Sequence, residues 1–152
     1  MPEPWTTDRP RLLVVADDQD AGELLTRLLD RAGWTTDLAY SAASGLSELD
    51  ETQYVGLVID LIDPSAGLQV LQTVRADPGT ATLPVVVCVR PGAYPGDAWI
   101  TGADAVLVHP FDADALVAEV ADAVARPVED REAHRQTQVG LSIPDAPEPP
   151  AH

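Results

Sequence analysis

Short apolar runs alternate with amphipathic segments along most of the chain. Four runs, at 12–15, 55–59, 84–89 and 105–109, are rich in valine, leucine and isoleucine, as buried strands are. A more polar segment at 35–40 also fits a strand. Between them apolar residues recur every three or four positions, the spacing of one helix face, at 21–32, 42–49, 65–76 and 113–124. This order predicts a parallel sheet with helices on both faces, because crossovers between parallel strands are right-handed.

Residues that flank the predicted helices indicate where these begin and end. Ser41 and Asp112 are placed to cap the second and the last helix. The segment at 90–98 is a poor helix former because Pro95 and Gly96 interrupt it. A truncated fourth helix of one or two turns is therefore expected.

The two ends of the chain differ in composition from the middle. Residues 1–10 contain three prolines and are predicted to be a flexible leader. From Pro127 the apolar periodicity disappears and prolines accumulate, so 127–152 is predicted to be a disordered tail, although 129–138 could extend the preceding helix. The folded domain is expected to span 11–126.

Composition limits the kinds of partner. The chain has 152 residues and a formal net charge of −16, which suits one domain and disfavours nucleic acid and anionic membrane surfaces as partners. No stretch approaches the ~18 apolar residues of a membrane span, and no signal segment opens the chain, so a cytoplasmic location is expected. The single cysteine, Cys88, excludes an internal disulfide and is expected to be a buried, unreactive thiol.

Acidic residues stand at the ends of two predicted strands. Asp60 ends the run at 55–59, and Asp17 and Asp18 follow the run at 12–15. In open α/β sheets the carboxyl ends of the strands border the crevice where ligands bind. Neighbouring carboxylates repel one another unless a cation lies between them, so this arrangement indicates a site for a hard metal ion.

Four stretches, in order and spacing, resemble the receiver domain of two-component response regulators, the CheY-like family. They are Arg-Leu-Leu-Val-Val-Ala-Asp-Asp at 11–18, Val-Ile-Asp-Leu-Ile-Asp-Pro at 58–64, Leu-Pro-Val-Val-Val at 83–87 and Gly-Ala-Asp-Ala-Val-Leu-Val-His-Pro-Phe at 102–111. The resemblance implies an α/β (βα)5 flavodoxin-like fold, a doubly wound parallel sheet with strand order 2-1-3-4-5.

In this family a sensor histidine kinase donates a phosphoryl group to one aspartate, with Mg²⁺ bound nearby. The resemblance places the phosphoacceptor at Asp60 and metal ligands at Asp17, Asp60 and the backbone carbonyl of Ile62. Asp18 could support the metal or instead cap the following helix. Mg²⁺ keeps several water ligands, so these few protein oxygens could suffice for a weak site, and complete absence of the ion stays open.

Four positions depart from the family pattern. Ala16 replaces the first acid of the acidic pair, Val89 replaces a threonine or serine that holds a phosphoryl oxygen, and Val106 replaces an aromatic switch residue. His109 stands where the family has a lysine that contacts the acceptor carboxylate. It could support the added charge, or it could be only a polar residue at a strand end. These losses predict an atypical, degenerate receiver.

The sequence favours two functions and disfavours a third. The first is a stand-alone receiver that accepts phosphate on Asp60 and signals by docking another protein. The second is a pseudo-receiver that binds proteins independently of phosphate. An enzyme is not expected, because the acidic loop at 16–20 would repel a flavin phosphate, and Asp60 and Asp63 have the wrong interval for a phosphatase acid pair. The cognate kinase, the output partner and the existence of a homodimer stay open.

Overall fold

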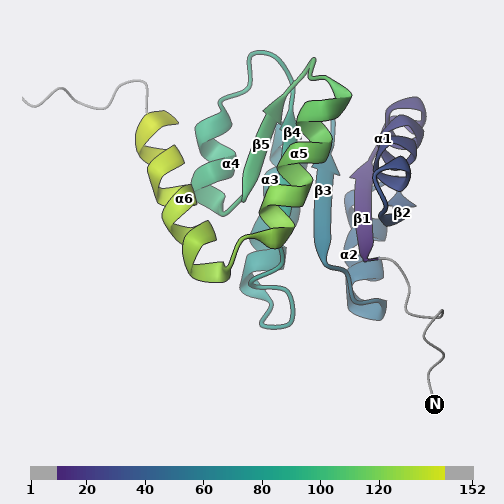
Figure 1. Cartoon of the computed structure of the whole chain (residues 1–152), viewed down its shortest axis with the longest axis horizontal. Coiled ribbons are helices and arrows are strands. Elements are labelled where there is room, and N and C mark those ends of the chain that lie inside the picture. Colours follow the sequence, from purple (N-terminus) through teal and green to yellow (C-terminus); the bar gives the residue numbers. More distant parts are fainter. Residues whose placement is uncertain (1–9, 143–152) are drawn as a thin grey trace, which may run out of the picture.

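The computed structural model describes residues 10–142 as a three-layer α/β fold (Figure 1). In this part of the chain the strands are β1 (Arg11–Ala16), β2 (Thr35–Ala39), β3 (Gly56–Asp60), β4 (Val85–Val89) and β5 (Ala105–Val108). The helices are α1 (Gln19–Arg31), α2 (Ala42–Glu51), α3 (Pro64–Ala76), α4 (Pro95–Thr101), α5 (Ala113–Ala125) and α6 (Val128–Ser142). All strand pairs are parallel in the order β2-β1-β3-β4-β5, which confirms the predicted fold class. The predicted leader, but for its last residue, and the end of the predicted tail, at 143–152, lie outside the described residues.

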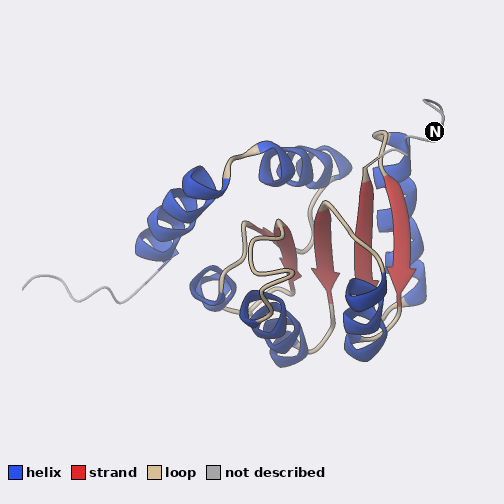
Figure 2. Ribbon diagram, turned by 90° about the horizontal axis from the view of Figure 1, so that it is seen from below, coloured by secondary structure: helices blue, strands red, loops and turns tan. Residues whose placement is uncertain are grey.

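The sheet is the middle layer, with α1 and α5 on one face and α2, α3 and α4 on the other (Figure 2). Successive side chains of a strand point to opposite faces. In β1, Leu13 and Val15 therefore pack toward α2 and α3, whereas Leu12 and Val14 pack toward α1 and α5. Strands β3 and β4 are buried throughout because both of their faces are covered. The edge strand β2 is only partly buried, which explains its more polar sequence.

Side-chain caps and a glycine fix several helix ends. Ser41 and Asp112 accept hydrogen bonds from the backbone N–H groups of Ser44 and Ala115, as the sequence predicted. The fourth helix, α4, has only seven residues. It ends at Gly102, whose φ of 122° lies in the left-handed region that favours glycine. None of the helices within the described range is long and apolar enough to cross a membrane.

The prediction of a disordered tail is wrong for residues 128–142, which form α6. Pro127 and the extended backbone of Arg126 separate this helix from α5, so it is not a continuation of α5 either. It packs against α4 beside the β5 edge of the sheet (Figure 1). There the ring of His134 lies 5.5 Å from that of Trp99 in an edge-to-face arrangement.

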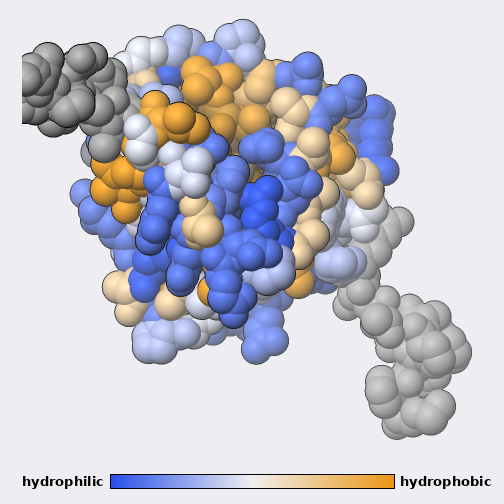
Figure 3. Space-filling view, turned by 60° about the vertical axis from the view of Figure 1, so that its left-hand side comes forward, coloured by the Kyte–Doolittle hydropathy of each residue, from blue (hydrophilic) through white to orange (hydrophobic). Residues whose placement is uncertain are grey.

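A buried carboxylate explains how α6 docks without a strong apolar stripe. Asp104, whose side chain has no exposed surface, forms ion pairs with Arg75 of α3 and with Arg131 and Arg135 of α6, at 2.9, 3.3 and 2.7 Å. It also accepts the backbone N–H of Val85 at 2.8 Å, so the buried charge is well compensated. Hydrophobic periodicity could not reveal this helix, because charged groups make these contacts and much of the surface on that side of the molecule is hydrophilic (Figure 3).

Candidate functional site

Asp60 lies at the C-terminal end of β3, beside Ala16 of β1, and its side chain is 1% exposed. One carboxylate oxygen, Oδ1, lies 2.9 Å from Nε2 of His109 and 3.5 Å from a guanidinium nitrogen of Arg90. The other oxygen, Oδ2, is buried and has no hydrogen-bond partner among residues 10–142. Asp60 is therefore anchored through one oxygen, while the other is left without a partner in this part of the chain.

His109 directly follows β5 and is held at the end of the sheet by its backbone, because its N–H donates to the carbonyl of Val89 at 2.9 Å. When Asp60 is ionised its carboxylate can only accept, so Nε2–H of His109 is then the donor in this contact. The ring packs at a tilt against Phe111, with 4.7 Å between the ring centroids. The structure thus brings the supporting residue that the sequence named into contact with Asp60.

Arg90 is a functional candidate that the sequence analysis missed. It directly follows β4, and its side chain is 33% exposed. The signal was present, since the carboxyl ends of parallel strands meet at one edge of the sheet and Arg90 is a cation at such an end. Arg90 supplies a permanent positive charge beside Asp60.

The two acids after β1 have different roles. Both carboxylate oxygens of Asp17 accept the backbone N–H of Ile62, at 3.1 and 3.2 Å, which ties the loop after β3 to the end of β1. Asp18 caps α1 by accepting the backbone N–H of Asp20 at 3.3 Å. Of the two roles that the sequence left open for Asp18, the structure contains the helix cap.

Three of the positions that the resemblance marked as losses carry hydrocarbon side chains. Ala16 is fully buried and offers only a methyl group next to Asp60. Val89 and Val106 pack in the apolar cluster on the face of the sheet covered by α2, α3 and α4. These positions supply neither a hydroxyl donor nor an aromatic ring.

Cys88 of β4 is buried, as predicted, and lies close to Asp60 and His109. Burial raises the pKa of its thiol, the negative charge of Asp60 raises it further, and Arg90 opposes the rise. One ligand atom from each of Asp60, Cys88 and His109 lies within 4.8 Å of the other two. Across the described part of the chain, this is the one group of three or more such side chains with that proximity.

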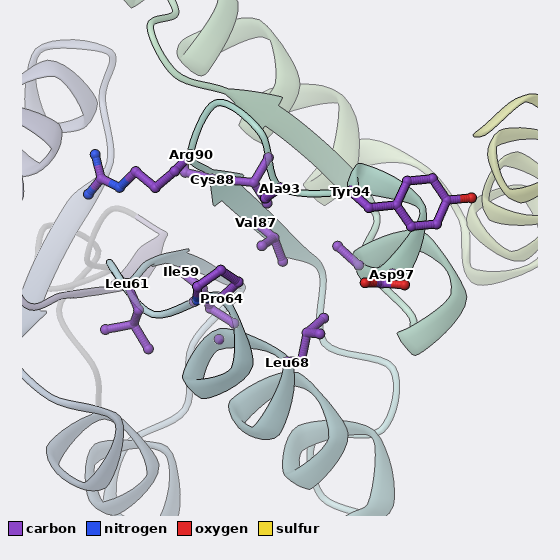
Figure 4. A pocket seen from close by; sticks show the side chains of 13 residues that line it. Ile59, Leu61, Pro64, Leu68, Val87, Cys88, Arg90, Ala93, Tyr94 and Asp97 are labelled. Carbon is purple, nitrogen blue, oxygen red and sulfur yellow. The ribbon is translucent and has the colours of Figure 1, made fainter. Parts of the chain in front are cut away.

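Two pockets border the site from opposite faces of the sheet. The first, of about 310 Å³, lies between α1 and the loop after β5; Asp60, His109 and leucines of α1 form part of its wall, so it gives the site an opening to solvent. The second, of about 230 Å³, lies between α3 and α4 and is lined mostly by apolar side chains such as Leu68 and Val87 (Figure 4). In Figure 4 the guanidinium of Arg90 extends away from that apolar wall.

Comparison with known proteins identifies the family. The family model described as the response regulator receiver domain matches residues 12–121. The transcriptional regulatory protein DltR of Streptococcus agalactiae is 32% identical over 72% of this chain and 50% of its own. The DNA-binding dual master transcriptional regulator RpaA of Synechocystis is 30% identical over 73% of this chain and 47% of its own. The chain belongs to the response regulator receiver domain family and spans about half the length of these curated relatives.

Solved structures agree with this assignment. A protein described provisionally as a response regulator, from Chloroflexus aurantiacus J-10-fl, has a TM-score of 0.74 and 29% identity over 78% of this chain and 100% of its own. The chemotaxis response regulator CheY4 of Vibrio cholerae has a TM-score of 0.69 at 18% identity over 76% of this chain and 98% of its own, a likeness of fold alone. The chain is therefore a receiver domain of two-component signalling.

Proposed function

We propose that this receiver domain accepts a phosphoryl group on Asp60 from a sensor histidine kinase and acts through contact with another protein. One observation supports the proposal most directly. Oδ2 of Asp60 is a buried carboxylate oxygen with no hydrogen-bond partner in the described residues, and Asp60 lines a pocket that opens to solvent. In this role the chain is an acceptor and binding module and not an enzyme.

The unpartnered oxygen is suited to be the nucleophile. Oδ2 of Asp60 would attack the phosphorus of a phosphohistidine, so that a P–O bond forms, the P–N bond breaks and the donor imidazole takes up a proton. A bound phosphoryl group carries about −1.5 to −2 charges. The chain contains no lysine to offset them. Arg90 and a protonated His109 would supply the positive charge instead.

Mg²⁺ would be held by Asp17, Asp60 and the backbone carbonyl of Ile62. The carboxylate of Asp60 fits a cation that prefers oxygen ligands, and the hydrogen bonds between Asp17 and Ile62 keep that loop beside the end of β1. The side chain of Ala16 provides no oxygen, so the site has one acid fewer than the family pattern and should be weak. When bound, the ion would neutralise charge on the phosphoryl oxygens.

A second function, phosphate-independent binding of a protein, is favoured by the packing of Val89 and Val106. Both side chains belong to the apolar surroundings of the sheet, so neither can form a polar contact that exists only with a phosphoryl group present. A modification that makes no differential contacts with two states cannot shift their equilibrium. On this alternative the fold serves as a protein-binding module whatever the state of Asp60.

Intact-mass spectrometry of the full chain, incubated with Mg²⁺ and a small acyl phosphate or a phosphorylated histidine kinase, separates the two functions. The proposed function requires a single phosphoryl adduct that maps to Asp60 and is absent in Asp60→Asn. The matched variant Asp63→Asn changes an acid that caps α3 and should label like wild type. Failure of wild type to label from either donor would refute phosphoryl acceptance and leave the phosphate-independent function.

A further inference from the structure

Asp60, Cys88 and His109 form a row across three neighbouring strands on one face of the sheet. The register of β3 with β4 puts Asp60 next to Cys88. Cys88 is paired with Leu107, and His109 follows two residues later, so its side chain shares that face. The backbone of a parallel sheet therefore brings these three side chains together, independently of any flexible loop rearrangement.

The three side chains offer one oxygen, one sulfur and one nitrogen, which are the ligand types that Zn²⁺ uses. Their ligand atoms already lie within 4.8 Å of one another. Bond lengths of about 2.0–2.3 Å place the ligand atoms of a tetrahedral zinc site roughly 3.3–3.8 Å apart, so small side-chain rotations would complete the set. Asp60 and Cys88 are buried, and the partly exposed His109 lines the pocket beside α1, which leaves a fourth position accessible to water.

We propose that Asp60, Cys88 and His109 bind a thiophilic divalent transition-metal ion such as Zn²⁺, with water as the fourth ligand. An independent observation points to the same ligand: Oδ2 of Asp60 is buried without a hydrogen-bond partner in residues 10–142, an arrangement that a cation would satisfy. On binding, the thiol proton of Cys88 passes to solvent and a thiolate remains on the metal. His109 coordinates through a ring nitrogen that carries no proton, with its proton on the other nitrogen.

This proposed site shares Asp60 with the proposed Mg²⁺ site but differs from it in the chemistry of its other ligands. Mg²⁺ takes oxygen ligands and retains water, whereas thiolate and imidazole select softer ions. Arg90, 3.5 Å from Oδ1 and one-third exposed, can turn toward solvent when the metal replaces it as the counter-charge. Asp60 is shared by the two sites, so a soft metal and Mg²⁺ compete for it.

Control of Asp60 by a soft metal follows from that competition, and this consequence rests on the proposed function. A metal held by Asp60 and Cys88 occupies the oxygen that would attack the phosphoryl donor. Zn²⁺ should then block phosphoryl acceptance, and a chelator should restore it.

Absorption spectroscopy with Co²⁺ as a probe for Zn²⁺ tests the metal site in the full-length protein. Bound Co²⁺ should give a thiolate-to-metal charge-transfer band that Zn²⁺ abolishes by displacement, because Cys88 is the single cysteine of the chain. Cys88→Ser should remove the band, and His109→Gln should weaken Co²⁺ binding at least about tenfold. His134→Gln is the matched control, because this histidine lies on α6 against Trp99. The substitution should leave the charge-transfer band and the Co²⁺ affinity unchanged.

The variants keep the proposal open to refutation. Circular dichroism shows whether Cys88→Ser folds; if it does not, His109→Gln decides, since its side chain is partly exposed. Absence of a thiolate band in wild type overturns the site. Equal Co²⁺ affinity in wild type and His109→Gln also overturns it, because the binding would then be adventitious.

Phosphoryl labelling with and without Zn²⁺ distinguishes failure of this inference from failure of the proposed function. Labelling of the metal-free protein that falls at least tenfold with Zn²⁺, and does not fall in Cys88→Ser, supports the regulatory consequence. A charge-transfer band without any labelling of metal-free protein refutes phosphoryl acceptance and leaves the metal site standing. Labelling without a band refutes the metal site, and labelling undiminished by bound Zn²⁺ refutes only the regulation.

Discussion

The imidazole of His109 lies 2.9 Å from the carboxylate of Asp60 and links the end of β5 to the end of β3 across the intervening strand β4. Arg90, which follows β4, approaches the same carboxylate oxygen at 3.5 Å. An imidazole and a guanidinium thus lie beside Asp60, where the family resemblance implies an ammonium group. The side chains of His109 and Arg90 both contact Oδ1 of Asp60. The chemistry of the site therefore depends on what binds Oδ2.

Combining Val89→Thr with His109→Lys should speed phosphoryl incorporation into Asp60 by roughly tenfold or more. A hydroxyl donor and a permanent ammonium charge would then face the charge that develops during transfer. The rate is measured by an intact-mass time course with a small acyl phosphate. Val55→Thr, at an exposed position before β3, is the matched control and should leave the rate unchanged. Equal rates in wild type and the double variant would show that Val89 and His109 do not limit transfer.

Asp17→Asn should lower the affinity for Mg²⁺ by about tenfold, because one charged ligand of a site with few acids is lost. The amide oxygen of asparagine can still accept the N–H of Ile62, so the loop after β3 should keep its position. Amide chemical shifts during a Mg²⁺ titration report both the affinity for Mg²⁺ and the position of this loop. Asp18→Asn changes only the cap of α1 and should bind Mg²⁺ like wild type. An unchanged affinity in Asp17→Asn would remove the proposed site.

The fold could be predicted because each buried strand is an uninterrupted apolar run, and parallel order follows from the alternation with helices. Asp60 and Asp17 could also be found, because ligands of open α/β sheets bind at the carboxyl ends of the strands. The family resemblance also pointed to His109 as a neighbour of Asp60. Sequence spacing could not reveal that Cys88 would lie within 4.8 Å of both, because that proximity depends on the register between separate strands. In the same way, α6 depends on Asp104, a buried carboxylate far along the chain from the arginines that it binds. Local patterns carry no signal for such long-range charge pairing.

Cys88 should make the protein less stable at alkaline pH. Burial, with a further effect from Asp60, raises the pKa of its thiol above the ordinary value of 9.0. Above that pH the thiol ionises in the unfolded chain but stays protonated in the folded one. Its contribution to stability is therefore fully present below about pH 9 and is lost as pH rises.

Urea unfolding at about pH 8 and about pH 10 measures this contribution, which approaches 1.4 kcal/mol for each pH unit above the unfolded pKa. Cys88→Ala has no ionisable thiol and should lose less free energy of unfolding between the two pH values than wild type. All other titrating groups are common to both proteins, so they cancel in the comparison. Identical losses would mean that Cys88 ionises as readily in the folded protein as in the unfolded chain.

Asp104→Asn should destabilise the protein and loosen α6. The amide can still accept the backbone N–H of Val85, but the guanidinium groups of Arg75, Arg131 and Arg135 lose their buried counter-charge. Removing one partner from a buried ion pair costs about 3–5 kcal/mol, because charge is left uncompensated. Denaturant unfolding measures the loss. Hydrogen exchange should show the amides of α6 exchanging faster relative to those of α1.

Two further variants separate the buried cluster from ordinary surface charge. Asp50→Asn alters an exposed acid of α2 and should change the free energy of unfolding by less than about 0.5 kcal/mol. Arg135→Gln removes one cation and leaves the other two on Asp104, so it should cost less than Asp104→Asn. A loss below about 1 kcal/mol in Asp104→Asn would place these ion pairs among weak surface pairs. The docking of α6 would then have to come from its packing on α4, including the contact between His134 and Trp99.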